Sequence, residues 1–408
     1  EPEKKVDQYP HQFSGGMRQR VAIAIALLHK PKLVIADEPT TALDVSVQAE
    51  ILKEVKALVA ELGISMIWIS HDLATVASIS QKIAVMRLGK IVEMGSVAEV
   101  LGSPKHPYTQ GLLDALPSRK RPGELLTSSA TENAEQFSVS DDEPNKPIDA
   151  NPQFVSVQDV NMVFQKPVGS AGRFAQRLGI AKPPHVNHAV QSAHLPNARG
   201  EALGLVGESG SGKSTPTSGN VLVDGRKVRE NDSKIGTSVQ MIFQDPFASL
   251  DPRRTIFQSV ADGPIVHRLC TKKDARNYVN RWLKAVAFDS ALADRYPHQF
   301  SGGQRQRIAI ARALAMQPEL IVCDEPVASL DVSIQAQVIN LLLELKRHFN
   351  LTLLFISHDL SVVRHLCDRV VVMHHGKIVE EGVVSQIFAH PKQQYTRMLL
   401  DAVPQPAW

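Results

Sequence analysis

An internal repeat constrains the fold of this 408-residue chain more than any other feature. Residues 9–27 read YPHQFSGGMRQRVAIAIAL and residues 296–314 read YPHQFSGGQRQRIAIARAL, which is an offset of 287 residues. The same offset carries Asp37 to Asp324 without an insertion. Solenoid repeats have periods of roughly 20–50 residues, so this much longer period indicates a duplicated domain, here called copy one and copy two.

The two copies are unequal in length. Residues 154–287 precede the repeated part of copy two and have no counterpart in copy one. Between the copies, residues 118–152 are rich in Ser, Pro, Glu and Asp and poor in apolar residues, a composition typical of a linker. We therefore predict the C-terminal part of a first domain at 1–117, a linker at 118–152 and a second domain at 153–408.

The composition narrows the functional classes. Hydrophobic residues make up 43% and charged residues 21%, as in ordinary globular proteins, and the net charge of +3 is too small to favour duplex nucleic acid as a partner. The three cysteines form no CxxC pair, so neither a disulfide framework nor a cysteine-based zinc or iron–sulfur site is indicated. Apolar runs fall short of the about 18 residues of a membrane span.

Hydrophobic patterning predicts the same alternation of elements in each copy. A helical stretch leads to an apolar strand ending in acids, and a second helix leads to a strand ending in Ser-His-Asp. Strands that read as continuous Val/Ile/Leu runs between amphipathic helices predict an α/β fold with a mostly parallel sheet covered on both faces. The predicted elements lie at 17–29, 33–38, 46–61 and 66–72 in copy one and at 304–316, 320–325, 333–348 and 353–359 in copy two.

A phosphate-binding loop is predicted in copy two alone. Residues 207–214, GESGSGKS, fit the pattern GxxxxGK[ST] and follow an apolar strand at Ala202 to Val206. Glycines let backbone N–H groups converge on phosphate oxygens, while Lys213 supplies charge and the Ser214 hydroxyl can bind Mg²⁺. A flexible Gly/Ser turn is the alternative, but the strand, glycines, lysine and serine together favour the phosphate loop.

The residues after this loop depart from the usual arrangement. A phosphate loop normally opens a helix, whose N-terminal N–H groups complete the anion site. Here Pro216 and Gly219 come almost at once and a strand-like VLVDG follows at 221–225. This leaves no room for a helix of the ~10–14 residues that are average in proteins, so we predict that the supporting helix is deleted.

Two acids and a histidine follow the predicted strands of copy two. Asp324 and Glu325 end an apolar strand downstream of the loop, where the first acid can support Mg²⁺ and the second can activate water. A solvated turn is the alternative for an isolated pair, but its recurrence at 37–38 favours the chemical role. His358 ends the next strand, where a structural cap and a catalytic group are about equally plausible without the repeat.

These motifs together resemble the nucleotide-binding domain of an ATP-binding cassette (ABC) transporter. The resemblance rests on SGGMRQR at 14–20 and SGGQRQR at 301–307, both like the family's signature segment, with the phosphate loop, the acid pair and His358 in family order. Two such domains in one chain resemble the fused ATPases of peptide and glutathione importers. Three further segments resemble the dipeptide, oligopeptide and nickel importer subfamily. These segments are MIFQDPFASLDPR at 241–253, HPYTQGLLDALP at 106–117 and QQYTRMLLDAVP at 393–404.

The resemblance implies a role for each matching residue. Phe164 would stack on adenine, although a phenylalanine of the core is an equally plausible interpretation. Gln244 would sense the γ-phosphate and, with Ser214 and Asp324, hold Mg²⁺. Glu325 would be the general base, and His358 would contact the γ-phosphate. The residues expected to bind the phosphates are Gly207, Gly210, Gly212, Lys213, Ser214 and Thr215.

Domains of this family pair head to tail, which implies a site composed of both copies. The phosphate loop of copy two would face the signature of copy one, at Ser14, Gly15, Gly16 and Met17. The second signature, beginning at Ser301, has no loop of this chain to face. At most one site of the pair can therefore work, unless two chains form a homodimer.

The resemblance implies an ATP-binding and ATP-hydrolysing subunit, with ATP and Mg²⁺ as cofactors, that energises import of peptides or a related solute such as glutathione. Its partners would be two transmembrane permease subunits and, indirectly, a periplasmic or extracellular solute-binding protein, at the cytoplasmic face of the bacterial inner membrane. The alternative is an inactive truncated remnant with weak or no ATP turnover, because the strands of copy one should leave apolar faces exposed. A translation or DNA-repair ATPase fits the subfamily tails and the low net charge less well.

Overall fold

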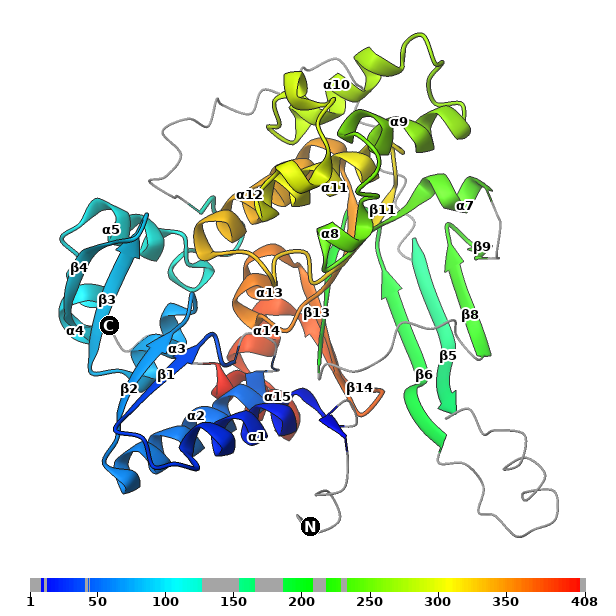
Figure 1. Ribbon diagram of the computed structural model, residues 1–408. Helices are drawn as coiled ribbons and strands as arrows, with labels where there is room; N and C mark the ends of the chain where they lie inside the picture. The colour runs from blue at the N-terminus through cyan, green and yellow to red at the C-terminus, as the bar shows by residue number, and fades with distance from the viewer. Residues whose placement is uncertain are drawn as a thin grey trace.

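The computed structural model describes residues 9–10, 13–40, 43, 45–126, 154–165, 186–207, 218–228 and 233–403 (Figure 1). Copy two contains a six-stranded sheet in the order β10-β11-β12-β7-β13-β14. Every neighbouring pair is parallel except β13 and β14, so the predicted α/β fold with a mostly parallel sheet is confirmed. The strands are β7 (Ala202–Gly207), β10 (Val239–Ile242), β11 (Leu320–Asp324), β12 (Thr352–Ile356), β13 (Arg369–His374) and β14 (Lys377–Val383).

Helices bury this sheet and form the main core of the molecule with it. The longest of them, α12, begins after Asp331, whose carboxylate accepts a hydrogen bond from Ile334 N at 3.0 Å, and ends at Asn350 in the left-handed conformation. Its buried face carries Val338, Leu342 and Leu345 at helical spacing. The helices of this layer are α11 (Gly302–Leu314), α12 (Val332–Phe349), α13 (Leu360–Leu366), α14 (Val384–Ala389) and α15 (Gln394–Ala402).

A helical subdomain packs against α11, and its helices α9 and α10 lie near the top of Figure 1. Its α9 starts with a capping box, in which Thr255 Oγ1 accepts from Gln258 N and Gln258 Oε1 accepts from Thr255 N. The side chain of Trp282 is buried in the core shared with α11 and α12. The helices of this subdomain are α8 (Pro246–Ser249), α9 (Ile256–Val266) and α10 (Ala275–Ala285).

A separate antiparallel sheet stands beside the main sheet, in the order β6-β5-β8-β9. Phe154, Val155 and Val223 of this sheet region pack with Leu320 of β11, which joins the two sheets through an apolar cluster. The strands are β5 (Val155–Gln165), β6 (Val186–Asn197), β8 (Ser218–Val223) and β9 (Arg226–Lys227), and the short helix α7 (Ser233–Ser238) leads from them to β10.

Copy one repeats the local elements of copy two but holds two small sheets, β1-β2 (parallel) and β3-β4 (antiparallel). As predicted, its strands expose apolar side chains, among them Leu33, Ile35 and Ile67. The elements are α1 (Gly15–Leu27), β1 (Leu33–Asp37), α2 (Val45–Leu62), β2 (Ser65–Ile69), α3 (Leu73–Ile79), β3 (Lys82–Arg87), β4 (Lys90–Ser96), α4 (Val97–Gly102), α5 (Pro107–Asp114) and the 3₁₀ turn η3 (Pro117–Arg119).

Several elements of the two copies pack against each other. Helix α2 lies against α15, and α5 with η3 lies against α12 and α13 (Figure 1). Ala115 of copy one and Leu126 of the predicted linker belong to the main core of copy two. In the part of the chain that the structure describes, no helix is both long and apolar enough to cross a membrane.

Both signature helices begin two residues before the predicted starts at 17 and 304. The difference arises because Ser14 and Ser301 act as N-caps, accepting from Met17 N at 3.3 Å and from Gln304 N at 3.4 Å. With the cap in place, the two glycines that follow occupy the first helical turn instead of a loop.

Candidate nucleotide-binding site

The strand order of the main sheet gathers the predicted site residues of copy two at one edge. Strands β10, β11, β12 and β7 are neighbours and run parallel, so their carboxyl ends meet there. These strand ends are followed or closed by Gln244, by Asp324 with Glu325, by His358 and by Gly207. Segments far apart in the sequence therefore meet at the edge where parallel α/β sheets bind ligands.

Glu325 is the centre of this group. Gln244 Nε2 donates a hydrogen bond of 2.9 Å to Glu325 Oε2, and His358 Nδ1 lies 3.3 Å from the same oxygen. The Glu325 backbone has a left-handed φ of 47°, and its N–H donates to Ile356 O at 2.9 Å, which ties the turn to β12. The Glu325 side chain is 18% exposed, so it is shielded but still reachable by a small ligand or water.

Asp359 fixes the turn that presents His358. Its carboxylate caps α13 by accepting from Ser361 N at 2.8 Å and Val362 N at 3.3 Å, while its own N–H donates to Ser357 Oγ at 3.0 Å. Burial raises the pKa of Asp359, against the opposing effects of His358 and the two backbone N–H groups. The carboxylate of Asp72, at the matching turn of copy one, also raises the pKa of Asp359.

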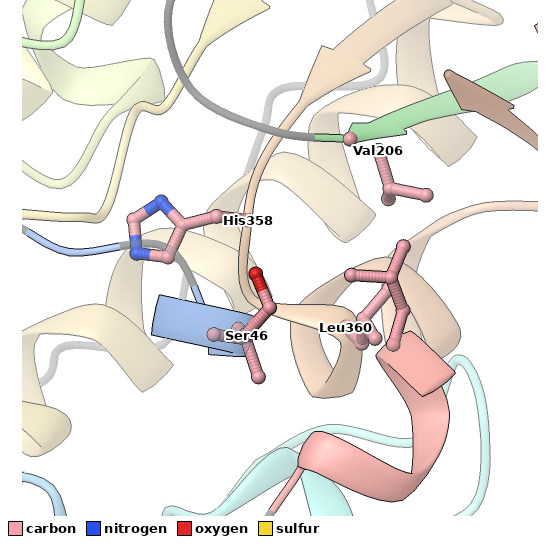
Figure 2. Close-up of a pocket in the computed structure, with 7 residues that line it drawn as sticks. Ser46, Val206, His358 and Leu360 are labelled. Atoms are coloured by element: carbon pink, nitrogen blue, oxygen red, sulfur yellow. The ribbon is translucent and has the colours of Figure 1, made fainter. Parts of the chain in front are cut away.

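Copy one also reaches the loop end of β7. Val45 and Ser46, at the start of α2, line a small cleft together with Gly207 and His358. Figure 2 shows Ser46 on α2 opposite His358, with Val206 and Leu360 on the other walls. The end of the strand that leads into the phosphate loop is therefore a contact between the copies.

Gly207 is required by packing as well as by its place at the start of the loop. A Cβ added to it would lie 2.5 Å from Met373 O of the neighbouring strand β13, which is backbone and cannot move aside. Any larger residue would push β7 away from β13, so the position of the end of β7 depends on this glycine.

Comparisons with known proteins decide the family. The family model described as "ABC transporter" matches residues 1–41 and 190–328. The model described as "Oligopeptide/dipeptide transporter, C-terminal region" matches 92–140 and 379–407, one match in each copy. The chain belongs to the ABC transporter family.

Curated relatives within this ABC family share sequence along nearly the whole chain. The glutathione import ATP-binding protein GsiA of Pectobacterium atrosepticum is 42% identical over 98% of this chain, and GsiA of Escherichia coli K12 is 44% identical over 98%. In both cases the chain spans 65% of the relative's length. Among solved structures, cbiO1 of Clostridium perfringens, part of the ABC transporter complex cbiONQ, is 26% identical, with a TM-score of 0.47, 59% of this chain covered and 92% of that one.

The two ABC signature segments adopt the same structure. In each, the second glycine lies against the next helix of its copy, α2 or α12. A Cβ on Gly16 would lie 2.5 Å from Val47 Cγ1, and a Cβ on Gly303 would collide with Ile334. Ser14, Gly15, Gly16 and Met17 therefore form a tight helix start in copy one. The roles of these residues toward a nucleotide remain predictions.

Several predicted residues lie outside the described part of the structure. These are Gly210, Gly212, Lys213, Ser214 and Thr215, and the predicted deletion of the helix after the loop falls on the same stretch up to residue 217. Phe164 is described only as a backbone position in β5, paired with Asn187 of β6. The predicted roles of all these residues remain predictions.

The described residues fit a magnesium ion that is held mainly by nucleotide and water. Mg²⁺ is usually bound by one or two carboxylates together with phosphates and waters. Asp324, at the end of β11, is a carboxylate that would supply one such oxygen. Among the described residues there is no group of three or more His, Cys, Asp or Glu side chains that could hold a metal alone. Such a site needs the ligand's own oxygens.

Sequence reasoning missed two contributors to this site. Asp359 was not predicted as a site residue. The sequence contained a signal for it, because Ser-His-Asp recurs at the same offset in both copies, and the structure shows that this aspartate is a buried helix cap. Ser46 was also missed. The sequence placed it just after Leu43-Asp44, in a segment resembling the D-loop, but its position opposite His358 depends on how the copies pack.

Proposed function

We propose that the chain is the ATP-binding and ATP-hydrolysing subunit of an ABC importer for peptides or a related small solute such as glutathione. The observation that carries this proposal is the group at the sheet edge, where Glu325 contacts both Gln244 and His358 beside the start of the phosphate loop. The two curated relatives are named as glutathione import proteins, which supports the choice of solute class.

In the proposed reaction, Glu325 accepts a proton from the water that attacks the γ-phosphate. A carboxylate that is partly shielded and held by a neutral donor can act as such a base, and Gln244 supplies that donor at 2.9 Å. His358 would contact the transferring phosphate; its proximity to Glu325 and the cleft that it lines with Gly207 support this role. Mg²⁺, held by Asp324, Gln244 and Ser214, would neutralise charge on the phosphates.

ATP would be bound mainly by the loop that begins at Gly207, with Gly210, Gly212, Lys213, Ser214 and Thr215 on the phosphates and Phe164 on the adenine. The approach of α2 to Gly207 and His358 supports a composite site, in which the helix start at Ser14 supplies N–H groups to the γ-phosphate. In this arrangement copy two supplies the catalytic residues and copy one supplies the opposing surface.

The proposed partners are two transmembrane permease subunits at the cytoplasmic face of the bacterial inner membrane. A periplasmic or extracellular solute-binding protein would deliver the solute to the permeases and contact this chain only through them. Two chains could also form a homodimer, which would give the signature at Ser301 a phosphate loop to face.

The test compares two matched substitutions in the purified chain with Mg-ATP. We expect Glu325→Gln to retain ATP binding and to lower turnover by at least about 100-fold, because the general base is lost. Glu38→Gln, at the counterpart position in copy one, should change turnover less than about twofold, because copy one contains no phosphate loop in this chain. Failure of the unmodified chain to bind Mg-ATP would refute the proposal and favour the inactive alternative.

A further inference from the structure

Near its start the predicted linker contains a short segment, residues 120–126, that follows copy one and lies on helices α12 and α13 of copy two. We propose that this segment is a latch, which docks through a turn at Gly123 and the backbone of Leu126 and holds copy one on copy two. The surface that binds it is formed by Asn340, Arg347 and His365 and is here called the groove. The proposal is independent of the proposed ATPase activity.

The groove recognises the latch through its backbone. Asn340 of α12 pairs with both polar groups of Leu126, since its Oδ1 accepts from Leu126 N at 2.8 Å and its Nδ2 donates to Leu126 O at 2.6 Å. One amide side chain that satisfies both the N–H and the C=O of Leu126 fixes the backbone of that residue in place.

The other end of the latch is held at Gly123 and Glu124. Gly123 N donates to His365 O at 2.9 Å, Arg347 Nη2 donates to Gly123 O at 2.6 Å, and His365 Nε2 lies 2.7 Å from Glu124 O. Gly123 has a φ of 75°, which a residue with a side chain adopts only with strain, so the turn there favours glycine.

An apolar anchor accompanies these hydrogen bonds. The Leu126 side chain is 3% exposed and belongs to the main core of copy two. At the other side, Arg119 Nη2 donates to Leu101 O at 3.1 Å, which ties the start of the latch to α4 of copy one. The segment is therefore attached to both copies, and its core anchor lies in copy two.

The groove is specific to copy two, although the helices that form it are repeated. The counterparts of Asn340, Arg347 and His365 in copy one are Lys53, Ala60 and Ser78, all of them exposed. The three groups that bind the latch have thus been replaced together by residues that could not reproduce its contacts. A general feature of the repeated fold would be expected in both copies, so this difference supports a dedicated docking site.

Amide hydrogen exchange on the intact chain tests the docking. We expect Asn340→Ala to raise the exchange rates of the Gly123 and Leu126 amides by at least tenfold, while the matched variant Lys53→Ala leaves both unchanged. The Gly123 amide decides the matter, because its acceptor is the His365 carbonyl, which the substitution leaves intact. If Gly123 stays protected while Leu126 alone exchanges faster, or if both amides exchange fast in the unmodified chain, the segment is not a latch.

A second experiment tests whether the latch holds the copies together. It includes Arg347→Ala alone, which removes only one contact of the latch. A protease site is placed within residues 127–152 of the full chain, and the cleaved products are separated by gel filtration. We expect the two products to co-elute for the unmodified chain and to separate when Asn340→Ala and Arg347→Ala are combined. Arg347→Ala alone, at an exposed position, should give partial separation. Separation without substitutions, or co-elution with both, would overturn the proposal.

Discussion

The two copies have nearly the same local geometry at matching turns, although the rest of the structure around these turns differs. Glu38 and Glu325 both have left-handed φ values, 44° and 47°. His71 lies 3.1 Å from Glu38, and His358 lies 3.3 Å from Glu325. Strand-turn-helix geometry of this kind is therefore specified by the repeated sequence itself and does not require a complete domain around it.

Burial shows the opposite behaviour. Leu320 of β11 is 3% exposed, whereas Leu33 at the counterpart position of β1 is 48% exposed. Leu320 packs on Phe154 and Val223, which belong to the segment that copy one does not contain. The same side chain at the same strand position is thus a core residue or a surface residue according to what the rest of the chain supplies.

The missing neighbour in copy one can be identified from the strand order. In copy two, β7 lies between β12 and β13 and pairs with both. Within the described residues, the counterpart strands β2 and β3 have no strand between them and belong to separate two-stranded sheets. One strand therefore decides whether the repeated elements form one sheet or two.

The largest change in stability that tests this comparison is expected from replacing the counterpart leucines Leu320 and Leu33 by alanine. Leu320→Ala should lower the free energy of unfolding by about 2–5 kcal/mol, because it removes a buried side chain from a packed cluster. Leu33→Ala should change it by less than about 0.5 kcal/mol, because nearly half of that side chain is already in water. Denaturant titrations followed by circular dichroism measure both values, and similar losses in the two variants would show that copy one is packed as tightly as copy two.

Much of the fold of copy two could be predicted from the sequence because its signals are local. The apolar strands at 320–325 and 353–359 were found from composition and length, and the structure places them as adjacent parallel strands, although β12 ends earlier, at Ile356. The site residues were found because they end these strands. The insertion of β7 between β12 and β13 could not be predicted from periodicity, because it depends on pairing over a long stretch of chain.

The docking of residues 120–126 could not be predicted from the sequence either. The composition of 118–152 indicates a linker. Nothing in the sequence of 120–126 predicts that its backbone groups form hydrogen bonds with Asn340 and His365. Recognition through the backbone leaves almost no signal in the recognised segment. The residues that recognise the segment, Asn340 and His365, lie on helices more than 200 residues further along the chain, so their pairing with it depends on how the copies pack.

A helix cap that differs between the copies gives a smaller effect. Ser96 caps α4, with Ser96 Oγ accepting from Glu99 N at 3.3 Å and Glu99 Oε2 accepting from Ser96 N at 2.8 Å. Its counterpart at the start of α14 is Val383, which makes no capping hydrogen bond. We expect Ser96→Ala to cost about 1 kcal/mol of stability and Val383→Ser to add up to about 1 kcal/mol, because Gln386 is in place to complete the box.

Thermal unfolding of the two cap variants measures these changes. Val383 is 45% exposed, so little packing is lost when serine replaces it. A further variant, Val383→Ala, separates the cap from the loss of valine, since alanine cannot cap. If Val383→Ser were no more stable than Val383→Ala, then α14 would be positioned by the neighbouring strand alone, and the repeated helix start would not respond to its local sequence.

The smallest effect concerns His365, whose counterpart in copy one is the exposed Ser78. Burial lowers the pKa of His365, while the carbonyl and the charge of Glu124 act in the opposite direction with smaller effect. The folded chain therefore disfavours protonated His365 relative to the unfolded chain, whose histidines titrate near 6.5.

Stability that comes from His365 should therefore be complete above about pH 6.5 and should fall as the pH drops below it, because the unfolded chain then binds the proton more readily. The loss levels off once the pH passes the lowered pKa of the folded chain. His365→Gln retains a side-chain N–H and does not titrate, so the stability difference between it and the unmodified chain isolates this effect. Denaturation midpoints of both proteins at pH 5.0, 6.0 and 7.5 measure it. If the midpoints of the two proteins change with pH in parallel, His365 becomes charged without disturbing the latch. If the difference between the midpoints changes from pH 7.5 to pH 5.0, the pH sensitivity lies in copy two, at the docked segment.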